Sequence, residues 1–350
     1  MKNLLVAQSG GPSVAINATL AGVVEKAMTN QNVGKIYGAK NGIMGILTDK
    51  LIDLTEALAD PETLQLLCQT PSSALGSCRM KLSDWEESTF EYDKILGIFR
   101  KYDIGYFVYI GGNDSMDTVA KLSAYCKEKG VEDIKVIGGP KTIDNDVWGT
   151  EMTFGFQSAV DIATEVIDCI HTTATSHGRI FIVEVMGHKV GWLNLYAGIA
   201  GGADIILLPE IPYDINEIAK VIEKREQAGK RFSILAVAEG AISKEEAKMK
   251  KKELKALRAS MPYPSISYKI AKELEEVTGH EIRVTVPGHF QRGGSPCAYD
   301  RFLCTRFGAA AARLIKNEQY GFMVALQNEK IVPVPLGEVA GKLKKVPVDS

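Results

Sequence analysis

The 350-residue sequence lacks long apolar stretches and any strong excess of charge of one sign. Its 41 Lys and Arg residues nearly balance its 43 Asp and Glu residues, which leaves a net charge of −2 at pH 7. This balance argues against a surface that binds nucleic acid or anionic lipid. No stretch approaches the roughly 18 apolar residues that a membrane-spanning helix needs. The first residues, MKNLLVA, fit a short strand better than a signal peptide. We therefore expect a cytoplasmic protein with no nucleic acid or membrane partner.

Cysteine pairs are also missing, because none of the six cysteines belongs to a CxxC motif. Their spacing resembles neither a disulfide framework nor a zinc site. Free thiols are expected, as in cytosolic proteins. What the chain does have is the composition of a globular protein, with 45% apolar and 24% charged residues. Its length is sufficient for two domains of ordinary size.

Short apolar runs alternate with segments of helical periodicity along almost the whole chain. Such an order predicts βαβ units, and hence α/β domains with mostly parallel sheets. The expected strands are 4–7, 106–110, 134–137, 180–185, 205–208 and 234–238, and the expected helices include 16–27 and 192–200. Ser243-Lys-Glu-Glu246 has the pattern of a capping box, which predicts a Lys/Glu-rich helix that continues to about residue 258.

Two polar strings follow predicted strands. Gly111-Gly112-Asn113-Asp114-Ser115 follows one of them, and the loop that contains Lys141, Asp144 and Asp146 follows the next. The carboxyl ends of parallel strands meet at the edge of the sheet where α/β proteins bind ligands. There the first string offers backbone N–H groups and a helix start to a phosphate. The second offers a cation and two carboxylates, which phosphoryl transfer to an alcohol requires.

Structural roles remain open for the same residues. Gly111-Gly112, like Gly10-Gly11-Pro12 after the first strand, is also typical of an ordinary strand–helix turn. The two aspartates can cap a following helix. Two glycine pairs at equivalent strand ends favour a phosphate site over this alternative.

Three arginines, Arg179, Arg283 and Arg292, flank apolar runs near glycine-containing turns. The guanidinium group binds phosphate through a rigid fork of donors. A single arginine in such a place is more often part of a surface ion pair, but three of them favour an anchor for a sugar phosphate. His289 is either a donor to the same group or an ordinary loop histidine.

At these residues the chain resembles the phosphofructokinase family. The resemblance covers nearly all of the chain and is carried by motifs in the family's order. They are Gly10-Gly11-Pro12 through Asn17, Gly76-Ser-Cys-Arg79, Gly111–Ser115, Pro140–Asp146, Glu184-Val-Met-Gly187 and Gly288-His-Phe-Gln-Arg-Gly-Gly-Ser-Pro296 with Tyr299-Asp300-Arg301. The resemblance implies two similar Rossmann-like three-layer domains with an active-site cleft between them. Residues 1–155 with roughly 296–350 would bind the phosphoryl donor and Mg²⁺, and 156–295 would bind fructose 6-phosphate.

The resemblance also implies roles for individual residues. Asp144 would be the base that deprotonates the 1-hydroxyl of the sugar, with Lys141 and Asp114 beside it. Gly11 and Arg79 would face the donor, and Asn113 takes the position of an aspartate that helps to hold the cofactor Mg²⁺. The implied fructose 6-phosphate site consists of Thr142, Asp146, Arg179, Met186, Gly187, His188, Glu239, Arg283, His289 and Arg292.

Some of these positions bear on assembly and control. Arg179 and Arg283 resemble arginines that a neighbouring subunit contributes, which implies a homodimer or homotetramer with shared active sites. His188 replaces an arginine that contacts phosphate in the family. Ala21 and Glu25 stand where bacterial relatives carry arginines for an allosteric nucleotide, so that control is expected to be absent.

The phosphoryl donor is predicted from two substitutions. ATP-dependent members of the family have glycine at the positions of Asp114 and Lys141, and both replacements resemble the pyrophosphate-dependent branch. A carboxylate at 114 adds negative charge where the α-phosphate of ATP would lie. Like charges near 4 Å repel by about 4 kcal/mol at an effective dielectric constant of 20.

The expected activity is therefore reversible transfer from pyrophosphate to fructose 6-phosphate, giving fructose 1,6-bisphosphate and phosphate, in glycolysis or gluconeogenesis. The alternatives are an ATP-dependent 6-phosphofructokinase and a catalytically weak regulatory subunit of the same family.

Overall fold

The computed structural model describes residues 1–349. The chain divides into two compact units. Unit 1 contains Met1–Ser158 and Arg292–Lys344, and unit 2 contains Ala159–Gln291 together with the segment that begins at Lys345.

The predicted domain limits lie a few residues from these boundaries, with one difference at the C-terminal end. The segment from Lys345 clusters with unit 2 rather than with unit 1, where we expected it. The contacts of Val346 give the reason. Its side chain is buried, and its N–H donates to Glu210 Oε1 of unit 2 at 3.1 Å.

Unit 1 is built on a seven-stranded sheet of order β11-β10-β5-β4-β1-β2-β3. Its inner neighbours are parallel, and the antiparallel pairs β10–β11 and β2–β3 stand at the two edges. The strands are β1 (Lys2–Gln8), β2 (Val33–Ala39), β3 (Leu51–Asp53), β4 (Ile104–Gly111), β5 (Lys135–Pro140), β10 (Phe322–Gln327) and β11 (Lys330–Pro335). The mostly parallel α/β architecture predicted from the sequence is confirmed.

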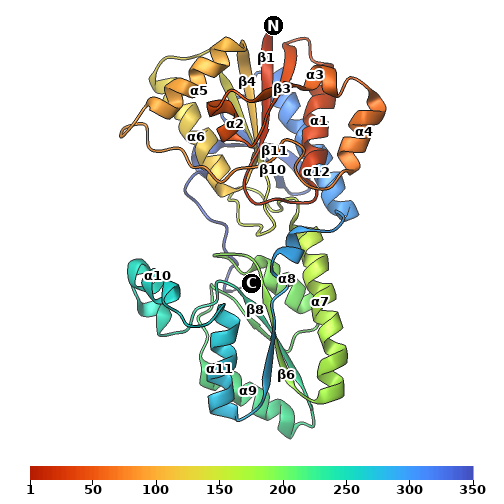
Figure 1. The fold of residues 1–350 in the computed structure, drawn as a ribbon, viewed down its shortest axis with the longest axis vertical. Coiled ribbons are helices and arrows are strands. Elements are labelled where there is room, and N and C mark those ends of the chain that lie inside the picture. Colours follow the sequence, from red (N-terminus) through yellow and green to blue (C-terminus); the bar gives the residue numbers. More distant parts are fainter. Residues whose placement is uncertain (350) are drawn as a thin grey trace. The chain divides into compact units, whose positions relative to one another are not determined.

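Helices cover both faces of this sheet (Figure 1). One core cluster joins α1 and α12 to the strands, and a second joins α2, α5 and α6 to them from the other side. The helices are α1 (Ile16–Met28), α2 (Ile43–Leu47), α3 (Leu54–Ala57), α4 (Pro61–Gln69), α5 (Phe90–Lys101), α6 (Asn113–Glu128), α12 (Ala298–Lys316) and α13 (Leu336–Val339). Unit 1 is therefore a three-layer sandwich.

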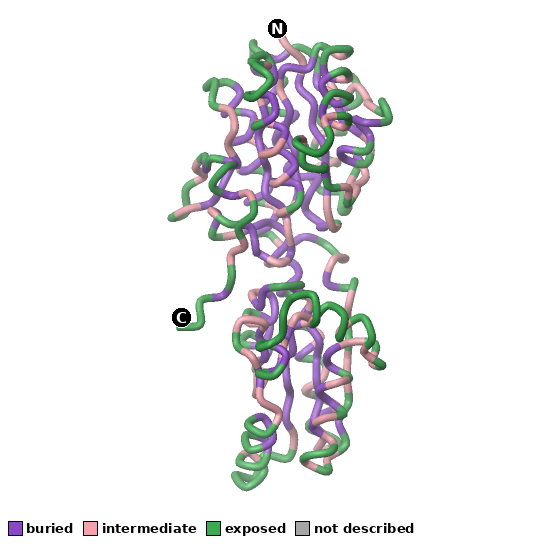
Figure 2. The backbone as a smooth tube through the Cα atoms, turned by 90° about the vertical axis from the view of Figure 1, so that its left-hand side faces the viewer, coloured by how far each residue is buried: buried purple, intermediate pink, exposed green. Residues whose placement is uncertain are grey.

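Unit 2 has a smaller sheet of four parallel strands in the order β7-β8-β6-β9. The strands are β6 (Ile180–Val185), β7 (Ile205–Leu207), β8 (Ser233–Ala238) and β9 (Ile282–Thr285). Both sheets are buried along most of their length, and exposure is concentrated on outer helices and loops (Figure 2).

The helices of unit 2 lie on both faces of its sheet. The α9 and α11 helices pack on one face, and α8 lies on the other, where the Asn194 side chain donates to Leu207 O and Ala236 O. Asp214 caps α9 by accepting from two backbone N–H groups of its first turn. The helical segments are α7 (Phe156–His177), α8 (Trp192–Ala200), α9 (Ile215–Gln227), α10 (Lys251–Ala259), α11 (Ile266–Thr278), η1 (Glu246–Lys248) and η2 (Gly288–Arg292).

The helix predicted from Ser243 to about residue 258 is wrong as one element. The reciprocal contacts of the capping box do form, since Ser243 N donates to Glu246 Oε2 and Glu246 N donates to Ser243 Oγ. They open only the short η1 turn. Met249 is extended, with ψ of 152°, and α10 begins after it.

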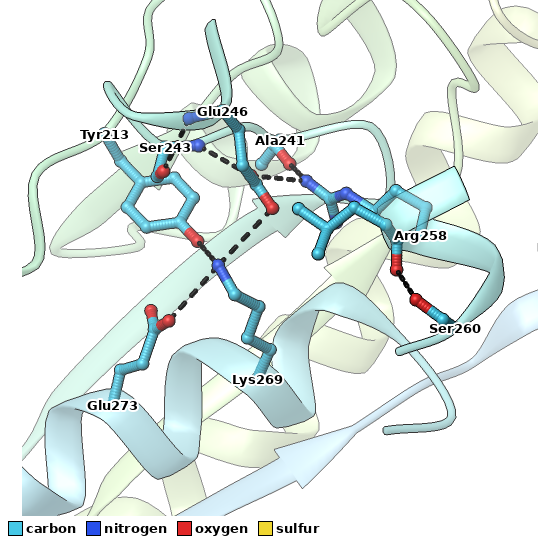
Figure 3. A network of polar contacts seen from close by, with 9 residues as sticks. Tyr213, Ala241, Ser243, Glu246, Arg258, Ser260, Lys269 and Glu273 are labelled. Atoms are coloured by element: carbon cyan, nitrogen blue, oxygen red, sulfur yellow. Dashed lines mark hydrogen bonds and ion pairs between the residues drawn. The ribbon is translucent and has the colours of Figure 1, made fainter. Parts of the chain in front are cut away.

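Because the helix is interrupted, Arg258 of α10 lies close to Glu246 of η1 (Figure 3). Arg258 Nη2 reaches Glu246 Oε2 at 2.8 Å and Ala241 O at 2.7 Å. Lys269 of α11 contacts the other oxygen of the same buried carboxylate at 3.4 Å. A buried carboxylate needs such partners, and a single straight helix would have carried Arg258 away from it.

Among residues 1–349, none of the helices combines the length and the apolar character that crossing a membrane requires.

Candidate active site

Three glycine-containing strand ends of unit 1 meet at one edge of the sheet. β1, β4 and β5 are neighbours, and the chain leaves them at Gly10-Gly11, Gly111-Gly112 and Lys141. Backbone bonds continue past the strands, from Ser9 N to Ile110 O and from Lys141 N to Gly111 O, both at 2.8 Å. Both polar strings of the sequence therefore lie at the same sheet edge, as predicted.

Lys141 is the buried cation of this edge. Its Nζ donates to Gly11 O at 2.6 Å, and a Cβ on Gly10 would stand only 2.9 Å from it. Gly10 itself has a φ of +80°, which a side chain rarely adopts. Burial first, and then the charge of Arg292, lower the pKa of Lys141 to about 7, while the Asp144 carboxylate opposes the shift. An anion bound here would restore the ammonium form.

Arg292 supplies a second cation to the same glycine loop. Its Nη1 donates to Pro12 O at 3.4 Å, and a Cβ on Gly11 would overlap its guanidinium. Within residues 1–349 its Nε is buried and has no hydrogen-bond partner. Exposed Arg79 adds further positive charge, enough to lower the pKa of Lys141 in part. The loop thus has two cations and, at Nε, an unsatisfied donor.

Two carboxylates follow on the loop after Lys141. Burial and the like charge of Asp144 raise the pKa of the Asp146 carboxyl to about 7. Thr142 fixes the start of this loop, because its Oγ1 accepts from Asp144 N at 3.1 Å and its carbonyl accepts from Thr153 Oγ1 at 2.8 Å. The loop therefore brings acid–base groups next to the cations Lys141 and Arg292.

Asp114 lies in the first turn of α6, as the sequence predicted for the start of a helix. It is exposed, and its Oδ1 is 2.6 Å from Lys81 Nζ. This carboxylate is therefore not the bare charge that repulsion of the ATP α-phosphate was expected to involve. The ion pair offsets part of that charge, although exposed pairs of this kind contribute only about 0–1 kcal/mol.

The resemblance implied only Asn113 as a protein ligand of Mg²⁺, and one amide oxygen is a partial ligand set. The Asn113 side chain bonds to Asp146, so an amide and a carboxylate are together. Among the described residues, no three His, Cys, Asp or Glu side chains gather closely enough to hold a metal ion by themselves. Protein-bound Mg²⁺ commonly uses one or two such oxygen ligands and takes others from substrate phosphates, which is the arrangement that Asn113 and Asp146 would allow.

In unit 2 the predicted residues at the sugar site form a rigid turn after β6. Glu239 Oε1 accepts from Gly187 N at 3.2 Å and from His188 N at 2.6 Å. Gly187 has a φ of +143°, and a Cβ there would be 2.6 Å from Val190 O. His188 has a φ of +52°, a conformation that non-glycine residues seldom adopt. Glu239 fixes a turn that the backbone alone would not favour.

Gln291 of η2 supports this turn and was not among the predicted site residues. Its Oε1 accepts from Met186 N at 3.1 Å, and its Nε2 donates to Gly288 O at 3.1 Å. It thereby ties the turn after β6 to η2, which carries His289 at an exposed position. The residue lies inside a motif already noted, Gly288–Pro296, but nothing in the sequence marked it as buried.

Arg179 and Arg283 lie at the other end of the unit 2 sheet from the Met186 turn, near the start of β6. Arg179 precedes β6, and Arg283 pairs in register with Phe181 near the start of the same strand. Both arginines contact the Glu281 carboxylate, Arg179 at 2.9 Å. A strand rises roughly 3.3 Å per residue, so the length of β6 separates these arginines from the Met186 turn by about 15 Å.

Comparisons with known proteins agree on one family. Residues 3–315 match the family described as Phosphofructokinase. A protein of Spirochaeta thermophila named ATP-dependent 6-phosphofructokinase is 45% identical over 348 residues, covering 97% of this chain and 92% of that protein. ATP-dependent 6-phosphofructokinase 3 of Bacteroides thetaiotaomicron is 41% identical, covering 97% and 94%.

Two solved structures with a similar fold are described as pyrophosphate-dependent, unlike the two relatives above, which are named ATP-dependent. The pyrophosphate-dependent phosphofructokinase of Nitrosospira multiformis has a TM-score of 0.86 and 28% identity, covering 99% of this chain and 86% of that chain. The enzyme of the same description from Marinobacter aquaeolei has a TM-score of 0.83 and 30% identity, covering 100% and 86%.

Proposed function

Because the chain belongs to the phosphofructokinase family, we propose that it transfers a phosphoryl group to the 1-hydroxyl of fructose 6-phosphate. The observation that carries the proposal is the placement of Lys141 and Arg292 on one glycine loop, next to the Asp144–Asp146 loop. Phosphoryl transfer needs fixed positive charge for the phosphate oxygens and a base for the attacking hydroxyl.

Each group then has a specific task. Lys141 binds the donor phosphates, and Asp144 accepts the proton of the sugar hydroxyl. Arg292, which the resemblance implied for the fructose 6-phosphate site, is assigned to the donor phosphates instead, because its guanidinium contacts Pro12 O of the glycine loop. When bound, Mg²⁺ would supply additional charge neutralisation, and the Asn113 amide and the Asp146 carboxylate would be the protein groups that hold it. The two pKa values near 7, for Lys141 and Asp146, are of the kind that burial produces where protons move at neutral pH.

The acceptor site uses the Met186–His188 turn of unit 2, with Glu239 as its support and His289 as a further contact. Arg179 and Arg283 bind the sugar phosphate in a second copy of the chain, since both lie at the end of their own sheet that is far from the Met186 turn. The protein is then a homo-oligomer with shared sites, acting in the cytoplasm.

For the donor we propose pyrophosphate, on the residues at the site itself. Asp114 adds bulk and charge beside the glycine loop, and Lys141 places an ammonium where it can hold a compact phosphate group. ATP is the second candidate, and the names of the most similar relatives favour it over pyrophosphate. The pairing of Asp114 with Lys81 also weakens the charge-based argument against ATP.

One assay decides between the donors. The kcat/KM values for pyrophosphate and ATP are measured with fructose 6-phosphate as acceptor, in the wild type and in Asp114→Gly, Lys81→Met and Asp114→Gly/Lys141→Gly. If Asp114 excludes ATP, Asp114→Gly raises kcat/KM for ATP about 10-fold or more, and the double variant raises it further. Lys81→Met removes the partner of the carboxylate and lowers ATP use still more.

A wild type that already prefers ATP overturns the pyrophosphate proposal and leaves the acceptor proposal intact. A wild type that binds fructose 6-phosphate but turns over neither donor identifies a regulatory subunit instead.

A further inference from the structure

The segment Leu343–Lys344, at the end of unit 1, lies against the loop that carries the two carboxylates. Leu343 forms an antiparallel bridge with Val147. Lys344 N donates to Asp146 O at 2.9 Å. A stretch almost 200 residues away in the sequence is thereby attached to the backbone of Asp146.

The Lys344 side chain continues this attachment. Its Nζ donates to Asn145 Oδ1 at 2.9 Å, to Thr150 O at 2.9 Å and to Glu151 O at 2.8 Å. These oxygens lie on both arms of the loop. Burial lowers the pKa of Lys344 to about 8, against the charges of Asp146 and Glu151. An ammonium placed in such surroundings is unfavourable unless its donors are used, and here they close the loop.

The residue that Lys344 contacts through Oδ1 has an unusual backbone. Asn145 has a φ of +54°, in the left-handed region that asparagine tolerates better than most residues. Its carboxamide makes further bonds within the loop, since Oδ1 also accepts from Thr153 N at 3.0 Å and Nδ2 donates to Glu151 O at 3.3 Å. Asn145 stands between Asp144 and Asp146, so its φ sets the directions in which both carboxylates leave the chain.

We propose that Lys344 is a positioning residue for phosphoryl transfer: its ammonium holds the Asn145 turn and thereby aims the Asp144 and Asp146 carboxylates. The inference rests on the proposed function. Lys344 itself touches neither substrate. Catalytic groups must be held to within about 0.5 Å of their productive geometry, and a misplacement of about 1 Å can lower the rate 100-fold.

The principal test compares Lys344→Met, Lys344→Arg and Lys345→Met. Lys345 is the matched control, because it is the adjacent lysine in the sequence and is exposed. With fructose 6-phosphate and the better donor, Lys344→Met lowers kcat about 10- to 100-fold and changes the KM for fructose 6-phosphate by less than about threefold. Lys344→Arg restores most of kcat, because a guanidinium can donate to the same oxygens. Lys345→Met behaves as the wild type.

A second readout does not depend on turnover. Trp148 lies in the loop and is 45% exposed, so its fluorescence anisotropy reports loop motion once Trp85 and Trp192 are replaced by Phe. Lys344→Met should lower this anisotropy, and Lys345→Met should not. Asn145→Gly accepts the left-handed backbone, whereas Asn145→Ala does not, so the glycine variant retains more of kcat than the alanine variant.

The outcomes separate the two proposals. A wild type without activity on fructose 6-phosphate overturns the proposed function, whatever the anisotropy shows. If the wild type is active, the positioning role is refuted by a Lys344→Met variant that keeps more than half of kcat at a temperature well below its Tm. If Lys344→Met does not fold, wild-type kcat in Asn145→Ala refutes it equally.

Discussion

The candidate sites of the two units are built in different ways. In unit 1 the candidate site is made of charged side chains, with buried Lys141 and half-buried Arg292 against a glycine loop and two carboxylates beside them. In unit 2 it is made of backbone, with the turn after β6 fixed by the Glu239 and Gln291 side chains. Charged groups held at fixed positions act most strongly on groups whose charge changes during a reaction. A rigid backbone turn instead selects a shape.

From this contrast we expect substitutions in the two units to affect kcat and KM differently. Changes at the unit 1 loops should lower kcat, because the loops act on developing charge. Changes in unit 2 should raise the KM for the sugar with little effect on kcat, because binding there is uniform along the reaction. The following substitutions test the contrast, from the largest expected effect to the smallest.

Asp144→Ala should nearly abolish turnover and leave binding of fructose 6-phosphate within about threefold of the wild type. Loss of a general base costs about 10²–10⁴-fold. Steady-state kinetics give kcat, and calorimetry with the sugar phosphate gives the affinity. Asp161→Ala, at an exposed carboxylate of α7, is the control. Retention of more than half of the wild-type kcat would remove Asp144 from this role.

Arg283→Ala should raise the KM for fructose 6-phosphate about 10- to 100-fold and leave the KM for the phosphoryl donor unchanged. The reason is the loss of a charge-assisted bond to phosphate, worth about 1.5–3 kcal/mol. Because Arg283 would serve a second copy of the chain, sedimentation at assay concentration should show at least a dimer. A fully active monomer would contradict this assignment.

Glu239→Ala should raise the KM for fructose 6-phosphate about three- to tenfold, since the N–H groups of Gly187 and His188 lose their acceptor. Glu239→Gln keeps one carbonyl oxygen and should stay within about twofold of the wild type. Kinetics of the pair separate the backbone support from the charge. Equal losses in both variants would mean that the carboxylate charge itself binds the sugar.

The smallest effect concerns protons at Lys141. In the free protein its pKa is about 7, and a bound phosphate favours the ammonium and raises that pKa. Between pH 7 and the raised value, binding must therefore take up protons and weaken as the pH rises. Below pH 7 the ammonium is already formed, and the effect disappears.

Calorimetry of pyrophosphate binding at pH 8, in buffers of different ionisation enthalpy, measures this uptake. Lys141→Arg is the control, because a guanidinium does not titrate in this range. An identical proton uptake in both proteins would show that Lys141 is not its source.

The sequence predicted the strand ends well, and for a clear reason. The run 106–110 is apolar and β-branched or aromatic and is followed by two glycines, so both the strand and the loop after it could be located. The structure has β4 at Ile104–Gly111 and α6 directly after it. The local apolar pattern was sufficient here because the candidate site begins directly after the strand that this pattern marks.

Other features could not be predicted because they depend on distant partners. Lys344 meets Asn145 across nearly 200 residues, and nothing in its neighbourhood distinguishes it from Lys342 or Lys345. The break before α10 depends on the burial of Glu246 between Arg258 and Lys269. The shared contact of Arg179 and Arg283 with Glu281 follows from strand register, which the sequence alone did not specify.

The α10 helix has a consequence for how unit 2 unfolds locally. None of its residues is buried, so little apolar area holds it in place. Its attachment depends instead on the Arg258–Glu246 contact. We expect the backbone amides of α10 to exchange with solvent through local unfolding of this helix alone. The amides of β6 and β8 should exchange only when the whole sheet unfolds. Each such opening removes Arg258 from the buried Glu246 carboxylate and leaves Lys269 as its remaining cation. The α10 helix therefore shields a buried charge although few contacts hold the helix in place.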